Sequence, residues 1–94
     1  MRQGDVVKVH ALRRGRAEAI EAVAHGEPGK SQVVGRTIEA IKLPQGTSIS
    51  AIVRGKKVMQ AHHDTVVEEN DHVILFMTDR RHIDEVEQLF QADG

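Results

Sequence analysis

The sequence of 94 residues predicts one small α+β domain, and three observations support this fold class. Residues 72–77 are apolar on both faces, which is typical of a central strand or of a strand covered on both sides. Residues 48–54 alternate apolar and polar side chains, as a half-buried strand does. Residues 80–91 carry an apolar stripe at helical spacing. We therefore expect strands and a terminal helix around a single core.

The N-terminal third predicts a strand followed by an ambiguous segment. Residues 5–12 indicate a strand whose apolar members are Val6, Val7, Val9 and Leu12, and the basic run at 13–16 ends it. In residues 17–25 the apolar side chains share one helical face, so the pattern alone predicts a helix with Ala19, Ile20, Val23 and Ala24 inward. A loop rich in glycine and proline follows at 26–30.

The middle of the chain predicts a helix and then a hairpin. Ser31 is a suitable N-cap for a helix over 32–41, and Pro44 disfavours its continuation. The dipeptide Gly55-Lys56 provides a two-residue turn between strands at 48–54 and 57–61.

The last third predicts turns, a strand and a helix. Residues 62–64 form a second turn, 65–67 a short extended piece and 68–71 a polar turn before the apolar strand. Asp79 is a suitable N-cap for the final helix, whose apolar stripe is Ile83, Val86, Leu89 and Phe90.

Composition excludes several classes of protein. The formal net charge is -1, which argues against a general nucleic-acid binder. There is no cysteine, so a disulfide scaffold, a zinc ribbon and thiol catalysis are excluded. Two phenylalanines without Trp or Tyr make a poor base-stacking platform. With no long apolar run and no signal-peptide pattern, we expect a cytoplasmic protein.

The charge is unevenly distributed along the chain. Residues 1–16 carry five Lys/Arg against one Asp, 17–63 carry six against four Glu, and 64–94 carry two against nine Asp/Glu. One interpretation is a set of solvated faces that differ in charge. The other is a basic head that meets the acidic tail of a second copy and steers its association.

Few residues suggest chemistry of their own. The run His62-His63-Asp64 is either a polar turn or a weak metal site, and a metal-dependent hydrolase there is the enzyme hypothesis to be tested. Arg13, Arg14 and Arg16 form a weak candidate for anion binding. Because no nucleophile or phosphate-loop motif is present, we expect no enzyme, no catalytic residue and no bound metal.

Two stretches carry the pattern of a known family. The first is Val34-Gly35-Arg36-Thr37-Ile38 followed by Ile41-Lys42-Leu43-Pro44. The second is Ser48-Ile49-Ser50-Ala51-Ile52-Val53-Arg54-Gly55, then Thr65-Val66 and Asn70-Asp71-His72-Val73. Together they resemble the C-terminal lobe of RCK domains (TrkA-C), which regulate potassium conductance. Residues 4–22 are similar to the regulatory subunit of bacterial Trk potassium uptake, so the resemblance covers nearly the whole chain.

The resemblance implies a β-α-β-β-β-α lobe, a mostly antiparallel sheet with helices packed against it. In that fold residues 17–25 are a strand, and we follow this expectation over the helical pattern. It also divides the chain into a basic N-terminal strand or linker at 1–16 and the RCK C-terminal domain at 17–94.

The resemblance further implies a regulatory, ligand-sensing lobe of a Trk-type potassium-uptake system. Such lobes form homodimers and act on a membrane potassium-transport subunit, which would place the chain at the inner membrane through its partner. NAD or another nucleotide is expected only on an N-terminal lobe that this chain lacks, so we expect no cofactor and no nucleic acid here.

In relatives a small anion binds in the crevice between two copies. By position in the motif, the matching residues are Ser50, Ile52 and Arg54, and His62 is the cation that we expect beside Arg54. Relatives often have a proline just before the Thr of the motif, where this chain has Ala61-His62-His63-Asp64. The alternative function is a free-standing sensor of small anions or nucleotides that uses Arg13, Arg14, Arg54 and His62.

Overall fold

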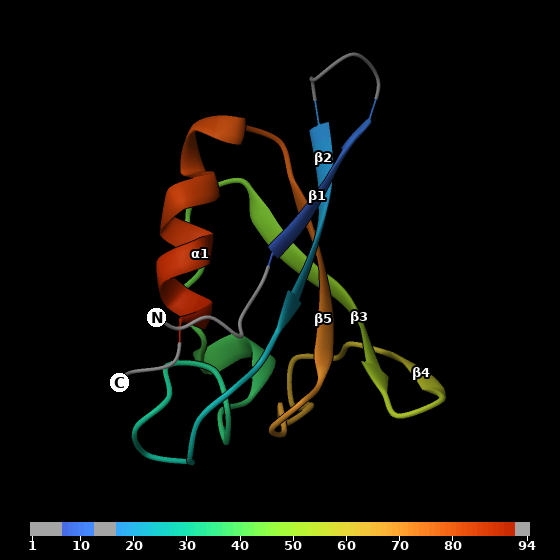
Figure 1. The fold of residues 1–94 in the computed structure, drawn as a ribbon, viewed down its shortest axis with the longest axis vertical. Coiled ribbons are helices and arrows are strands. Elements are labelled where there is room, and N and C mark those ends of the chain that lie inside the picture. The colour runs from blue at the N-terminus through green and yellow to red at the C-terminus, as the bar shows by residue number, and fades with distance from the viewer. Residues whose placement is uncertain (1–6, 13–16, 92–94) are drawn as a thin grey trace.

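The computed structural model describes residues 7–12 and 17–91, and it places one helix against a five-stranded antiparallel sheet (Figure 1). The strands are β1 (Val7–Leu12), β2 (Ala17–Val23), β3 (Thr47–Arg54), β4 (Lys57–Gln60) and β5 (His72–Met77). A 3₁₀ turn at Ile38–Ala40 precedes β3, and a second at Arg80–His82 leads into α1 (Ile83–Phe90). The expected α+β class with a mostly antiparallel sheet is confirmed.

The most apolar strand lies at the centre of the sheet, as its sequence predicts. The strand order is β1-β2-β5-β3-β4, so β5 has a hydrogen-bonded neighbour on each side. Val73, Leu75 and Met77 are fully buried toward α1, whereas His72 and Phe76 on the opposite face are exposed. The alternation follows from the pleat, which points successive side chains to opposite faces.

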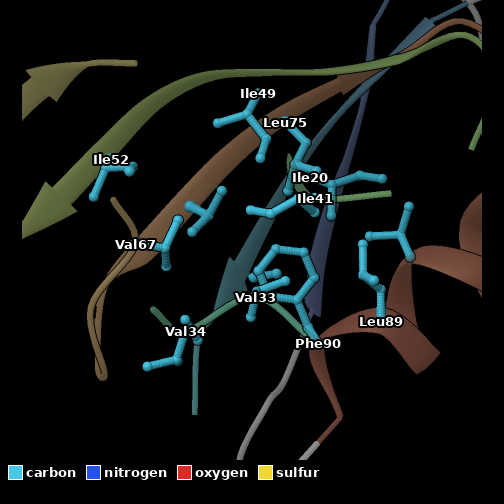
Figure 2. Packing of buried hydrophobic residues seen from close by; sticks show 14 of the residues in the cluster. Ile20, Val33, Val34, Ile41, Ile49, Ile52, Val67, Leu75, Leu89 and Phe90 are labelled. Carbon is cyan, nitrogen blue, oxygen red and sulfur yellow. The ribbon is translucent and has the colours of Figure 1, made fainter. Parts of the chain in front are cut away.

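The core lies between the sheet and α1. Figure 2 shows Leu89 and Phe90 reaching from α1 toward the sheet, and Val86 is buried with them. Three buried loop residues complete the core: Val33, Val34 and Val67. Burying a side chain of this size contributes about 1.5–3 kcal/mol, so the helical stripe fixes α1 on this face.

The helix that the pattern alone predicts over 17–25 is wrong, and the strand that the resemblance implies is correct. Ile20 and Ala22 are fully buried and alternate with the half-buried Glu21 and Val23, which is the period of a strand. β2 pairs with β1 on one side and β5 on the other, and these ladders take the backbone hydrogen bonds that a helix would have used.

The helix predicted over 32–41 is also wrong. The Ser31 hydroxyl accepts hydrogen bonds from the backbone of Val33 and Val34, at 3.0 and 2.9 Å, but it caps only a turn. Gly35 then has φ +85°, and its N–H donates to the Val67 carbonyl at 2.7 Å. Because Gly35, Ile38 and Glu39 donate to carbonyls of residues 63–67 and not to carbonyls one helical turn back, only Ile38–Ala40 is helical.

The hairpin follows the sequence closely, whereas the last helix begins at Ile83, three residues later than predicted, with His82 and not Asp79 at its N-cap. β3 and β4 meet at the predicted Gly55-Lys56 turn, and β4 ends one residue earlier than expected. The Asp79 carboxylate accepts the backbone N–H of Arg81 at 3.0 Å, so it caps the 3₁₀ turn that precedes α1. No helix in the described part of the chain is both long and apolar enough to span a bilayer.

Candidate functional site

The candidate site is built around Arg54, the last residue of β3. Its guanidinium forks onto the Asp71 carboxylate, with Nε to Oδ1 at 2.9 Å and Nη2 to Oδ2 at 2.8 Å. Asp71 directly precedes β5, the antiparallel neighbour of β3, so the two residues meet at the same end of the sheet. Two parallel charge-assisted hydrogen bonds fix both the position and the orientation of the pair.

The two terminal nitrogens of the guanidinium also contact oxygen atoms of the segment that connects β4 and β5. Nη2 donates to the Val66 carbonyl at 3.0 Å, and Nη1 lies 3.2 Å from the Glu68 carboxylate. Asp71, which is 1% exposed, further accepts the Glu68 backbone N–H at 2.8 Å. Arg54 therefore fastens residues 66–71 to the end of β3. We call Arg54, Val66, Glu68 and Asp71 the Arg54 clamp.

The clamp stabilises the charged form of the Arg54 side chain. The hydrogen bond to Asp71 raises the pKa of the guanidinium above its ordinary value, and the charges of Asp71 and Glu68 act in the same direction against partial burial. Nε and Nη2 are held by Asp71 and Val66, and Nη1 has one carboxylate contact for its two N–H groups, so an incoming anion would approach at Nη1 beside Glu68 or displace it. Glu68, whose side chain is 61% exposed, is the partner most open to such exchange.

The structure distributes the other expected ligand residues over different environments. His62 is exposed at the 62–64 turn, where its backbone N–H donates to the Thr65 hydroxyl at 3.0 Å. The half-buried Ser50 hydroxyl donates to the Ile74 carbonyl at 3.4 Å. Ile52 is fully buried in the core, so a ligand could reach it only if the core opened. The set Ser50, Ile52, Arg54 and His62 stays a prediction.

The other sequence candidates add little to this site. Arg13, Arg14 and Arg16 lie outside the described residues. Within the described ranges, no group of three or more His, Cys, Asp or Glu side chains is arranged to hold a metal ion, and the turn at 62–64 is no exception. His63 instead lies 3.8 Å from the Glu39 carboxylate on the surface.

A pocket of about 320 Å³ lies at the opposite end of β3 from the clamp. It is lined by Gln45, Gly46, Thr78, Asp79, Arg81 and His82. Arg81 holds Asp79 through several hydrogen bonds, the shortest 2.6 Å long. These bonds are the main reason that the pKa of the Asp79 carboxyl lies well below its usual range. The pair neutralises itself, so the pocket presents no free charge from these two residues.

Comparison with known proteins decides the family. The family model of the TrkA-C domain matches residues 28–91, which include the Arg54 clamp and α1. The chain belongs to the TrkA-C domain family. The resemblance drawn from the sequence motifs is thereby confirmed.

The similarity to TrkA proteins extends through β1 and β2 as well. The chain is 63% identical over 92 residues to the Trk system potassium uptake protein TrkA of Halomonas elongata, with 98% of the chain covered. It is 56% identical over 91 residues to that of Vibrio alginolyticus and 45% identical over 94 residues to that of Haemophilus influenzae, with 97% and 100% covered. The chain spans 20% of the length of these relatives.

The sequence pattern does not reveal the partners of Arg54. It predicts Glu68 and Asp71 only as members of a polar turn. A signal was nevertheless present, because Asp71 immediately precedes the most apolar strand and Arg54 ends the alternating one. If these two strands pair antiparallel, their facing ends bring an arginine and an aspartate together.

Proposed function

We propose that this chain is a regulatory lobe of a Trk-type potassium-uptake system, which controls cation transport by a membrane subunit and has no catalytic activity. The observation that carries the proposal is the 63% identity over 92 residues to a Trk system potassium uptake protein. At that identity the strand register, the core and the clamp are expected to be shared across the aligned segment. The lobe then lies in the cytoplasm and reaches the inner membrane through its partner.

The proposed mechanism is a shift between two arrangements of a homodimer. A ligand or partner that binds one arrangement more tightly increases its population and so biases the attached transport subunit. A ligand with equal affinity for both arrangements has no effect, however tightly it binds. The chain has no Gly-x-Gly-x-x-Gly motif, so we place no NAD or other dinucleotide on it.

The division of the chain into 1–16 and 17–94 is part of the proposal. β1 lies in the first segment and pairs with β2 over six registered residue pairs. The basic N-terminal segment would therefore connect the lobe to the rest of a longer regulator and also provide an edge strand of the sheet.

A chimera tests the regulatory role. The matching 92 residues of the Halomonas elongata relative are replaced by this chain, and rubidium uptake is measured in cells that lack their own Trk regulator. We expect uptake close to that of the intact relative, whereas a version truncated before the lobe should lose its regulated uptake. Uptake by the chimera no better than that of the truncated version would overturn the proposal.

The alternative function is a free-standing sensor of small anions at Arg54 and His62. The exposed His62 and the exchangeable Glu68 contact of Arg54 favour it. Calorimetric titration of the chain with inorganic phosphate and with nucleotides separates the alternatives. Heat with one ligand that is lost in His62→Ala supports a sensor, and no heat with any of them rules out this set of ligands.

A further inference from the structure

Glu68 occupies the nitrogen of Arg54 that has donors left for an anion from solution. Nε and Nη2 donate to the Asp71 carboxylate and to the Val66 carbonyl, at distances of 2.8–3.0 Å. These three bonds use every N–H group of Nε and Nη2. Nη1 has two N–H groups, and its one partner among the described residues is the Glu68 carboxylate at 3.2 Å. A ligand of Arg54 therefore meets Glu68 first.

The two carboxylates of the clamp differ in how easily they can leave Arg54. Asp71 is buried and accepts two hydrogen bonds from Arg54 and one from the Glu68 backbone. Its separation from Arg54 would leave a buried charge without its cation, which is costly. The Glu68 side chain is exposed, and Arg54 is its one ion-pair partner in the described part of the chain. Exposed ion pairs are weak, so the Glu68 carboxylate can exchange Arg54 for water.

The backbone of Glu68 is fixed even though its side chain is exposed. Its N–H donates to the Asp71 carboxylate at 2.8 Å, and its carbonyl accepts the Asp71 N–H at 3.1 Å. The preceding residue, Val67, donates to the Arg36 carbonyl at 3.0 Å. The Glu68 carboxylate is therefore tethered next to Arg54. A tethered group acts at a high effective concentration, which a free anion has to overcome.

The charges in contact with Arg54, or opposite it in the strand register, are balanced while Glu68 is present. Arg54 faces Lys57 across β3 and β4, and facing residues of an antiparallel pair lie on the same side of the sheet. These two cations are matched by two carboxylates, Asp71 and Glu68. When Glu68 moves away or loses its charge, the group has one excess positive charge, which favours an anion at Nη1.

We propose that Glu68 is an autoinhibitory carboxylate, which competes with a small phosphate-type oxyanion for Nη1 of Arg54. The inference rests on the proposed function in its anion-sensing form, and it adds the group that regulates that site. The anion binds the fraction of molecules in which Glu68 has left, so its apparent affinity is reduced by that fraction. For an exposed ion pair the reduction is roughly fivefold at most. Repulsion between Glu68 and the anion adds to it.

Nuclear magnetic resonance titration of the full chain with inorganic phosphate, at constant ionic strength, tests the competition. Glu68→Gln keeps the size of the side chain and removes its charge, so it should bind phosphate roughly five- to tenfold more tightly than the unchanged chain. The Arg54 Nε–Hε signal should be among those that shift. The matched control is Glu69→Gln, because Glu69 is the exposed neighbour without an ion pair to Arg54. Screening should limit its effect to about twofold.

Three results would overturn the proposal. Equal phosphate affinities of Glu68→Gln and the unchanged chain would show that the carboxylate does not compete, while anion sensing would survive. Equal gains in Glu68→Gln and Glu69→Gln would show that net charge alone sets the affinity. Absence of phosphate binding in all three chains would remove both the competition and the phosphate sensor. No readout involves rubidium uptake, so the regulatory role tested by the chimera is judged separately.

Discussion

At the scale of single residues, Arg54 connects three parts of the chain. It bonds to Asp71, Glu68 and Val66 from the end of β3. The backbone of Asp71 is in turn tied to the end of β2, since its carbonyl accepts the Ala24 N–H at 2.9 Å. The removal of one partner of a buried ion pair is strongly destabilising, because the other charge remains buried. Arg54 thus has a structural role whether or not it also binds an anion.

Arg54→Ala should lower the free energy of unfolding by about 3 kcal/mol, because it leaves the Asp71 carboxylate buried without its cation. Arg54→Lys should be intermediate, since an ammonium cannot form the two-pronged contact. Lys57→Ala is the matched control, because Lys57 is the exposed cross-strand partner of Arg54. Urea unfolding followed by circular dichroism measures all three, since the chain has no Trp or Tyr for fluorescence. A loss below about 0.5 kcal/mol for Arg54→Ala, the size expected of a surface change, would contradict this role.

The sequence could identify Arg54 as an unusual residue but not its partners. A lone arginine at a strand end is equally suited to solvent, to a ligand or to a carboxylate. The choice depends on which strands are neighbours, and strand pairing between residues far apart in the chain is decided by tertiary packing. Ile52 illustrates the same limit, because the bulge between Ile49 and Ala51 helps set which side chains of β3 face the core.

At the scale of elements, the predictable parts were those with a strong period or a distinctive turn. The β3–β4 hairpin has an alternating strand and a turn, β5 has a continuous apolar run and α1 has a helical stripe, and the structure contains all three. For residues 17–23 the pattern alone predicts a helix instead of the observed strand, because alternating small and apolar residues also fit a helical face. The helix predicted over 32–41 is wrong because backbone N–H groups of this segment donate to carbonyls of residues 63–67. No local pattern reveals this pairing.

Gly35 should be the most sensitive point of this irregular segment. A Cβ at Gly35 would lie 2.8 Å from the Cβ of Pro28 at a backbone φ of +85°, so alanine there meets both a clash and an unfavourable backbone conformation. Gly29, at φ +92° with nothing within 4 Å, is the matched control with the unfavourable conformation alone. Gly35→Ala should therefore destabilise the chain by at least about 1 kcal/mol more than Gly29→Ala, as overpacking does. Equal denaturation midpoints for the two variants would show that the contact with Pro28 is unimportant.

At the scale of the whole molecule, α1 covers one side of the sheet in the described part of the chain. A chain of this length buries only about two thirds of the surface that it exposes when unfolded. Among the described residues α1 covers one face of β5, whereas Phe76 on the opposite face is 43% exposed. The two-sided apolar pattern of residues 72–77 predicts a central strand, whereas the neighbours of that strand depend on pairing between distant parts of the chain.

The molecular mass in solution tests the central claim most directly. The chain has a mass of 10.4 kDa, and light scattering can follow its mass from dilute solution to about millimolar concentration, where a micromolar dimer is saturated. We predict a mass that rises with concentration to twice 10.4 kDa. A mass that stays at 10.4 kDa over the whole range would contradict the homodimer on which the proposed mechanism depends.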